Sequence, residues 1–160
     1  MSYIAIDPGQ FKSGFVRFLK GELVECGHWE NGMVLSTIHA EDIVIVEWTV
    51  NYGRIIGEST LRTAFMCGMA KDRCKSKYAA YHEMNRKQVC RALVGKHEKK
   101  PVVNRAVLDL YPQTGGGAEP AIGTKNEPGP LRKLRELPKG QSLHVKDALA
   151  LFEAWKQVQI

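Results

Sequence analysis

The sequence predicts an α/β fold in which a mixed five-stranded sheet carries helices on both faces. Two observations lead to this prediction. Residues 1–30 contain three short β-rich stretches separated by turn-forming residues, which is typical of consecutive strands joined by hairpins. Residues 43–46 form a continuous apolar β-branched run without polar alternation, so both faces of that strand should be covered.

The predicted elements follow in order along the 160 residues, a length that suits one domain, residues 1–160, with a single sizeable core. Strands are expected at residues 3–6, 15–19, 23–29, 43–46 and 77–81. Helices are expected at residues 34–39, at 54–72, around 89–93 with Gly95 as the stop, from Pro101 to about residue 110, and at 143–157 with Ser142 as N-cap. Residues 112–141, rich in glycine and proline, are expected to form a long mobile loop, and such loops are often functional.

Positive charge is concentrated in one segment. The chain carries a net charge of +6, while residues 71–105 hold eleven basic and three acidic residues, so this segment is +8 and the remainder −2. A basic block on a nearly neutral body indicates a polyanionic partner, most commonly nucleic acid. A solvated basic face kept for solubility explains the charge about as well, and charge alone leaves both interpretations open.

Several function classes are disfavoured by what the sequence lacks. No apolar run approaches the twenty residues of a membrane span, and residues 1–7 lack the features of a secretory signal, so we expect a cytoplasmic protein without a membrane partner. The cysteines show neither C-x-x-C spacing nor a paired histidine pattern, so we expect buried thiols rather than a zinc site or disulfides. These cysteines are Cys26, Cys67, Cys74 and Cys90.

Acidic residues stand at the ends of predicted core elements. Asp7 ends the first strand, Glu47 ends the fourth, and Asp147 lies on the last helix with His144 one turn before it. If the first and fourth strands are neighbours, the two strand-end carboxylates emerge at one edge of the sheet, where the helix could present His144 and Asp147. Such a cluster would repel itself without a divalent cation, and Mg²⁺ suits carboxylate ligands.

Each of these residues also has an ordinary structural explanation. Asp7 precedes Pro-Gly and could form a turn, Glu47 could be a solvated strand end, and His144 and Asp147 could cap a helix. Taken singly, these explanations are the better ones. Taken together in one basic chain, the residues favour a metal site, in which two ions about 4 Å apart would support phosphodiester hydrolysis.

The sequence resembles a known family, the RuvC-type Holliday-junction resolvases of the RNase H-like (retroviral integrase) superfamily, and especially their small phage-type members. The matching segments occur in the expected order and span nearly the whole chain. They are IAIDPGQFKSGF at 4–15, IVIVEW at 43–48, RKQVCRALVG at 86–95, GTKNEPGPL at 123–131 and HVKDALAL at 144–151.

The resemblance implies an RNase H-like fold and a set of site residues. Asp7, Glu47, His144 and Asp147 match the metal-binding positions, with Mg²⁺ as cofactor and Mn²⁺ as a second metal that should support activity. His144 stands where some relatives have Asp. Lys100 and Arg91 match basic residues that act on the scissile phosphate.

The resemblance also implies a homodimer with the helix at 54–72 in its interface. Trp48 or Tyr52 could insert at the junction centre, although packing is the slightly preferred interpretation of both.

The function predicted on these grounds is Mg²⁺-dependent endonucleolytic nicking of Holliday junctions and other branched DNA. A basic face would hold the phosphates, and we assign to it Arg86, Lys87, Arg91, Lys96, Lys99, Lys100 and Arg105. One alternative is an RNA or RNA–DNA hybrid nuclease of RNase H or YqgF type. Another is a branched-DNA binding protein without catalysis.

Overall fold

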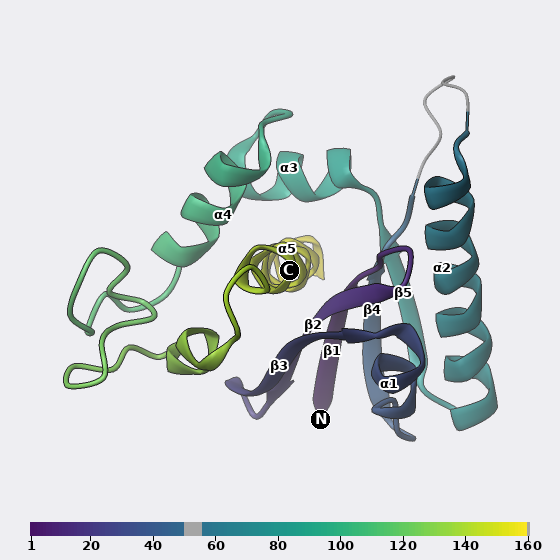
Figure 1. Cartoon of the computed structure of the whole chain (residues 1–160), viewed down its shortest axis with the longest axis horizontal. Coiled ribbons are helices and arrows are strands. Elements are labelled where there is room, and N and C mark those ends of the chain that lie inside the picture. The colour runs from purple at the N-terminus through teal and green to yellow at the C-terminus, as the bar shows by residue number, and fades with distance from the viewer. Residues whose placement is uncertain (50–55, 160) are drawn as a thin grey trace.

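The centre of the computed structural model, which describes residues 1–49 and 56–159, is a five-stranded sheet in the order β3-β2-β1-β4-β5 (Figure 1). The strands are β1 (Ser2–Asp7), β2 (Lys12–Leu19), β3 (Glu22–Glu30), β4 (Asp42–Glu47) and β5 (Ala80–Met84). β1, β2 and β3 pair antiparallel, whereas β4 pairs parallel with both β1 and β5. The predicted mixed sheet is confirmed, and the parallel pairing brings the C-terminal ends of β1 and β4 to the same edge.

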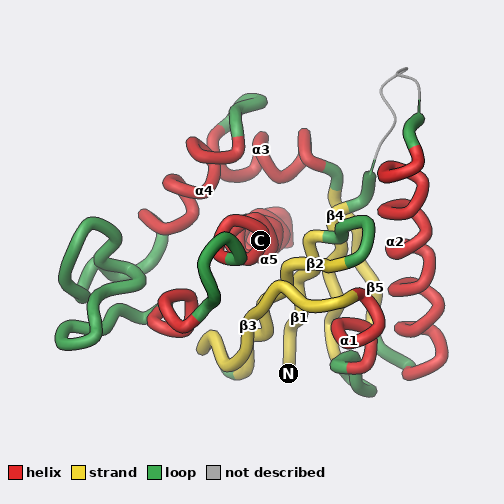
Figure 2. Tube along the Cα trace, in the orientation of Figure 1, coloured by secondary structure: helices red, strands yellow, loops and turns green. Residues whose placement is uncertain are grey.

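Helices cover both faces of this sheet, as predicted. α1 (Asn31–Ser36) and α2 (Glu58–Lys77) lie on one side, and α5 (Ser142–Gln159) lies on the other, with α3 (Arg86–Val94) and α4 (Lys100–Asp109) outside it (Figures 1 and 2). Within the described ranges, no helix combines the length and apolarity that crossing a membrane would require.

The core is divided by the sheet into two clusters. Ile4 and Ile6 of β1 pack under α1 and α2, whereas Ala5 packs under α5. The apolar run of β4 divides in the same way, since Val44 and Val46 belong to the first cluster and Ile45 to the second. Its lack of polar alternation therefore has the predicted cause, because both faces are covered. α5 is buried on every side from Asp147 to Trp155.

Several element boundaries differ from the prediction, most clearly those of α2, β5 and α1. α2 continues to Lys77 and ends at Tyr78, which adopts a left-handed conformation with φ 58°, so β5 begins only at Ala80. The last turns of α2 are polar in sequence but bury Cys74 in the core, and tertiary packing thus extends the helix. α1 begins at Asn31 rather than at residue 34. The predicted start of the second helix at residue 54 lies outside the described residues.

Residues 112–141 fold back on themselves and contain one short 3-10 helix, η1 (Arg132–Glu136). Backbone hydrogen bonds cross the segment, for example from Gly129 N to Ile122 O at 3.0 Å. Ile122, Leu131 and Leu134 are buried in the core on the α5 side. The segment is therefore anchored by apolar side chains, and its mobility stays a prediction.

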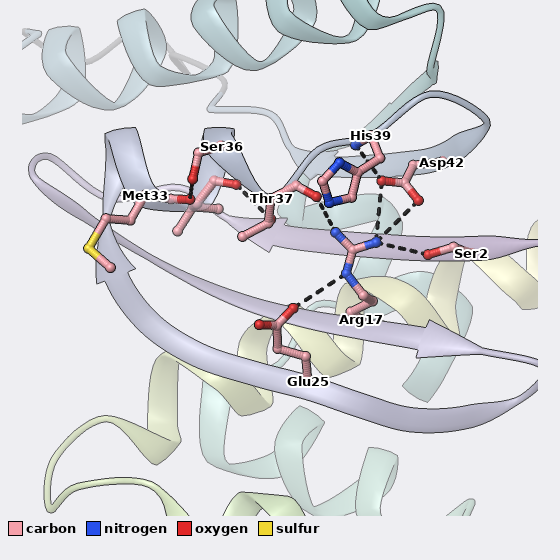
Figure 3. Close-up of polar contacts among 9 residues, drawn as sticks. Ser2, Arg17, Glu25, Met33, Ser36, Thr37, His39 and Asp42 are labelled. Atoms are coloured by element: carbon pink, nitrogen blue, oxygen red, sulfur yellow. Dashed lines mark hydrogen bonds and ion pairs between the residues drawn. The ribbon is translucent and has the colours of Figure 1, made fainter.

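Arg17 of β2 organises the end of the sheet at which β1 begins (Figure 3). Its guanidinium donates to Ser2 Oγ at 3.0 Å, to Asp42 Oδ1 at 3.2 Å and to the carbonyl of Thr37. Asp42 is 3% exposed and also accepts the backbone N–H of His39 at 2.7 Å. These bonds satisfy a buried carboxylate, so this network stabilises the sheet at its far end from the acidic residues of β1 and β4.

Candidate metal centre

Three of the four predicted metal ligands converge at the C-terminal end of β1. One ligand atom each from Asp7, His144 and Asp147 lies within 4.8 Å of the other two. The helix periodicity of α5 places His144 and Asp147 on one side, three residues apart, and α5 packs directly on β1 and β2. The structure therefore brings together three of the four residues of the predicted cluster, and their binding of a metal stays a prediction.

The carboxylates of this group are buried, whereas the imidazole is partly open. Asp147 is fully buried and Asp7 is 9% exposed, while 45% of the His144 side chain is accessible. His144 Nδ1 lies 3.4 Å from Asp7 Oδ2. The pKa of His144 is raised by this contact with Asp7, which outweighs the opposing effects of burial and of Lys100.

Lys100, the first residue of α4, faces the same group. Its Nζ donates to Asp147 Oδ2 at 2.5 Å, and about half of the lysine side chain is exposed. Burial opposes the charge on Lys100, but the bond to Asp147 and the carboxylates of Asp7 and Glu47 outweigh burial and raise its pKa. The predicted basic residue therefore lies beside the predicted acidic ones. Its raised pKa favours the protonated, positively charged form.

The Glu47 carboxylate interacts with the charges of Asp7, Lys100 and Asp147, but it lies outside the set of three atoms that converge within 4.8 Å. Burial raises its pKa to about 7, and the charge of Asp7 adds to this effect, while the charges of Arg86 and Lys100 lower it. Without a metal, the carboxyl group at the end of β4 therefore ionises only at a higher pH than usual. A divalent cation bound nearby would lower this pKa.

Two buried carboxylate oxygens indicate that these residues could bind a cation. Glu47 Oε2 and Asp147 Oδ1 are both inaccessible and have no hydrogen-bond partner among the described residues. Unpartnered buried oxygens are rare because they are costly, and oxygen donors of this kind are what Mg²⁺ and Mn²⁺ bind. The residues at this edge of the sheet therefore fit a divalent cation.

Sequence reasoning did not single out two further residues at this place. His28 of β3 stacks on His144, with ring centroids 4.3 Å apart and an interplanar angle of 14°. Gly14 of β2 lies under His144, and a Cβ added there would come within 2.4 Å of the His144 carbonyl oxygen. Gly14 lies within the matching segment 4–15, but nothing in that segment or around His28 indicates these contacts, because they depend on the pairing register of β1, β2 and β3.

The predicted DNA-binding residues lie on α3, α4 and the connection between them. Six of the seven are exposed, namely Lys87, Arg91, Lys96, Lys99, Lys100 and Arg105. Arg86 differs, because both terminal nitrogens of its guanidinium are buried and lack a hydrogen-bond partner within the described part of the chain. Since its charge acts on Glu47, Arg86 stands closer to the acidic group than the sequence suggested. The placement of Arg91 at a scissile phosphate stays a prediction.

The remaining predicted features lie away from this group. Trp48 packs against the core under α2, in agreement with the preferred interpretation, and Tyr52 lies outside the described residues. A groove of about 830 Å³ runs between α1 and α2, lined by residues that include Leu35, Phe65 and Met69. This groove lies on the opposite face of the sheet from Asp7, so it is separate from the candidate metal centre.

Comparison with solved structures identifies the fold. Thermus thermophilus RuvC aligns with a TM-score of 0.64 and 20% identity, covering 99% of this chain and 95% of the other. T. thermophilus RuvC in complex with a Holliday junction substrate aligns with a TM-score of 0.62 and 17% identity, over the same shares of both chains. No protein-family model and no curated protein matches the sequence. The predicted RNase H-like fold, as found in RuvC, is confirmed over nearly the whole chain.

Proposed function

We propose that this chain is a Mg²⁺-dependent endonuclease that nicks four-way DNA junctions and other branched DNA. The observation that carries the proposal is the convergence of Asp7, His144 and Asp147, with Lys100 against them, in a RuvC-like fold. One of the two similar RuvC structures holds a Holliday junction substrate, which supports branched DNA as the partner.

The metal would be held by Asp7, Glu47, His144 and Asp147. Divalent ions held by these residues would supply an activated water for attack on the phosphate and would offset the charge on the leaving 3′ oxygen. The carboxylates orient this centre, and burial keeps bulk water from competing with their charges. Mn²⁺ should also support activity, because it accepts the same oxygen and imidazole donors.

Lys100 would act on the substrate rather than on the metal. Its side chain is about half exposed and its ammonium contacts Asp147, so it could approach a phosphate oxygen and offset the charge that develops during attack. The exposed basic residues of α3 and α4 would hold neighbouring phosphates, so junction affinity should fall steeply with salt.

A homodimer would place two such centres on opposing strands of a junction. α2 exposes two large apolar side chains one helical turn apart, Leu61 at 58% and Phe65 at 69%. Pairing through α2 would cover them, and it leaves the acidic groups free on the other face of the sheet.

The test is a digestion of labelled four-way junction, linear duplex and RNA–DNA hybrid, each with and without Mg²⁺. We expect paired nicks in the junction only, and none with Asp7→Asn, which should still bind the junction because a repulsive carboxylate is gone. Faster cleavage of the hybrid would instead indicate an RNase H-type nuclease. Junction binding that is indifferent to Mg²⁺ and to Asp7→Asn, without cleavage by either protein, would indicate a binding protein without catalysis.

A further inference from the structure

Three residues form one row across the antiparallel part of the sheet. Asp7 of β1 is paired with Gly14 of β2, and Gly14 is paired with His28 of β3. Directly paired residues of antiparallel strands project from the same face, so Asp7 and His28 flank a central position that has no side chain. This row lies on the face that α5 covers.

His144 of α5 fills the vacant position in the row. A Cβ at Gly14 would lie 2.4 Å from the His144 carbonyl oxygen and 2.9 Å from its Cβ, so the helix approaches β2 this closely only over a glycine. The imidazole then lies between the two flanking side chains. Nδ1 faces Asp7 Oδ2 at 3.4 Å, and the ring face stacks on His28 at 4.3 Å between centroids.

The stacking contact matters because the contact with Asp7 restrains only one edge of the His144 ring. Nearly half of its side chain is accessible, and an exposed imidazole samples several rotamers. A histidine that binds a metal is normally oriented by neighbours outside the ligand set, most often through a hydrogen bond at its other ring nitrogen, and losing such support typically weakens metal binding 10–100-fold. Here Asp7 faces one ring nitrogen of His144, and the ring of His28 supports the face of the imidazole.

His28 is not itself placed to be a ligand. The two rings are nearly parallel, with 14° between their planes, so their nitrogens do not point at a common ion. His28 also lies outside the group whose ligand atoms converge within 4.8 Å.

We infer that His28 is a positioning residue, which by stacking on His144 holds that imidazole with Nδ1 directed toward Asp7 and so prepares it to bind the metal. The inference rests on the proposed metal centre. It predicts that the flat ring of His28 is required and that its nitrogens are not. His28→Phe should therefore retain the function of His28, and His28→Ala should lose it.

The test measures binding of Mn²⁺ alone by titration with detection of free Mn²⁺ by electron paramagnetic resonance. We expect roughly 10-fold weaker binding for His28→Ala and less than about twofold change for His28→Phe. The matched control is His82→Ala on β5, which removes another half-buried imidazole in an aromatic contact, with Trp155 at 5.3 Å, and should bind Mn²⁺ like the wild type.

A second measurement needs neither metal nor DNA. The ring-proton shifts of His144 in the metal-free protein should move in His28→Ala, because the neighbouring ring current is lost, and the stacked ring of His28→Phe should preserve a ring-current shift. If His28→Ala fails to fold, His28→Leu takes its place in both measurements.

The outcomes separate this inference from the proposed function. Wild-type Mn²⁺ affinity in the alanine variant, or equal loss in the alanine and phenylalanine variants, overturns the role of His28 even if junctions are nicked normally. A wild-type protein that binds Mn²⁺ but nicks no junction overturns the proposed function and leaves the role of His28 intact. A wild-type protein that binds no Mn²⁺ overturns both.

Discussion

Lys100 Nζ lies 2.5 Å from Asp147 Oδ2, which joins the first residue of α4 to a fully buried carboxylate of α5 across 47 positions of sequence. A buried carboxylate is costly without an opposite charge, and Lys100 supplies one. About half of the lysine side chain is exposed, so in the proposed reaction the same residue could also contact a phosphate. One side chain thus links the stability of the acidic group to the chemistry proposed for it.

Replacing Lys100 by Ala should slow junction nicking more than it weakens junction binding. We expect kcat to fall on the order of 100-fold, as when one preorganised donor to a developing charge is removed, with the Kd for the junction within about threefold of wild type. Single-turnover cleavage and a binding titration in Ca²⁺ separate the two quantities. Lys99→Ala is the matched control, since this exposed neighbour should affect binding alone. An unchanged cleavage rate in Lys100→Ala removes the lysine from the proposed reaction.

Replacing Glu47 by Gln should stabilise the metal-free protein at high pH. Burial and Asp7 raise the pKa of Glu47 from 4.5 to about 7, so between these values the folded state keeps a proton that the unfolded state has lost. The free energy of unfolding of the wild type therefore falls as the pH rises over this range. The glutamine variant lacks this titrating carboxyl group, so its free energy of unfolding does not fall for this reason. We expect the variant to be more stable by roughly 1–3 kcal/mol at pH 8 and about equal at pH 4.5.

Urea unfolding in EDTA at the two pH values measures this difference. The raised pKa of His144 acts in the same direction, with stability lost as pH rises, but it is common to both proteins and largely cancels in the comparison. A glutamine variant that loses stability at pH 8 would mean that the Glu47 carboxylate is partnered in a way the structure does not show.

Metal binding should weaken as the pH is lowered. His144 must be neutral to bind a metal and its pKa is raised by Asp7, while Glu47 must be ionised and its pKa is about 7. The Mg²⁺ concentration that gives half-maximal nicking should therefore rise steeply from pH 8 to pH 6. His144→Asp should make this rise shallower, because one of the two titrating groups is gone. Identical steepness in both proteins would argue that His144 is not a ligand.

The sequence predicted the strands and helices well where local pattern is sufficient. We could predict the uninterrupted apolar run of β4, the end of α3 at Gly95 and the apolar residues of α5 from the sequence. In each case the burial of a face produces a local pattern of apolar residues or a terminating glycine. Gly95 indeed ends α3 in a left-handed conformation with φ 77°. The extension of α2 beyond residue 72 was missed, since only packing of Cys74 reveals it.

The acidic side chains of the candidate site were also predictable, but their surroundings were not. Asp7 and Glu47 end strands, and His144 and Asp147 share a helix face. Their residue types and spacing can therefore be recognised from the sequence alone. The roles of His28 and Gly14 depend on strand register, which no local signal sets here. Arg86 was assigned to an exposed face, whereas its guanidinium nitrogens are buried near Glu47, because α3 follows β5 immediately.

Adding a methyl group at Gly14 should disturb both stability and the site. The new Cβ would meet the backbone of His144 at 2.4 Å, so α5 must shift, and overpacking of this kind typically costs about 1–3 kcal/mol. Gly32→Ala is the matched control, since nothing lies within 4 Å of its added Cβ, and in α1 it should be neutral or slightly stabilising. Urea unfolding gives the stability, and Mn²⁺ titration should show weaker binding for Gly14→Ala alone. Equal behaviour of the two variants would show that α5 does not need the close approach.

Placing a charge at Phe65 should prevent the proposed dimer from forming. Phe65 is 69% exposed on α2 and lines the groove beside α1, so it contributes little to the core of its own protomer but would be buried between two copies. Sedimentation of Phe65→Glu should give a monomer where the wild type gives a dimer. Val158→Glu, at another exposed apolar residue on α5, is the control and should remain dimeric. Because the acidic group lies on the other face of the sheet, Phe65→Glu should bind Mn²⁺ normally and yet lose paired nicking. A wild-type protein that sediments as a monomer at micromolar concentration would contradict the proposed dimer. A dimer that survives this substitution would show that the two copies do not pair through α2.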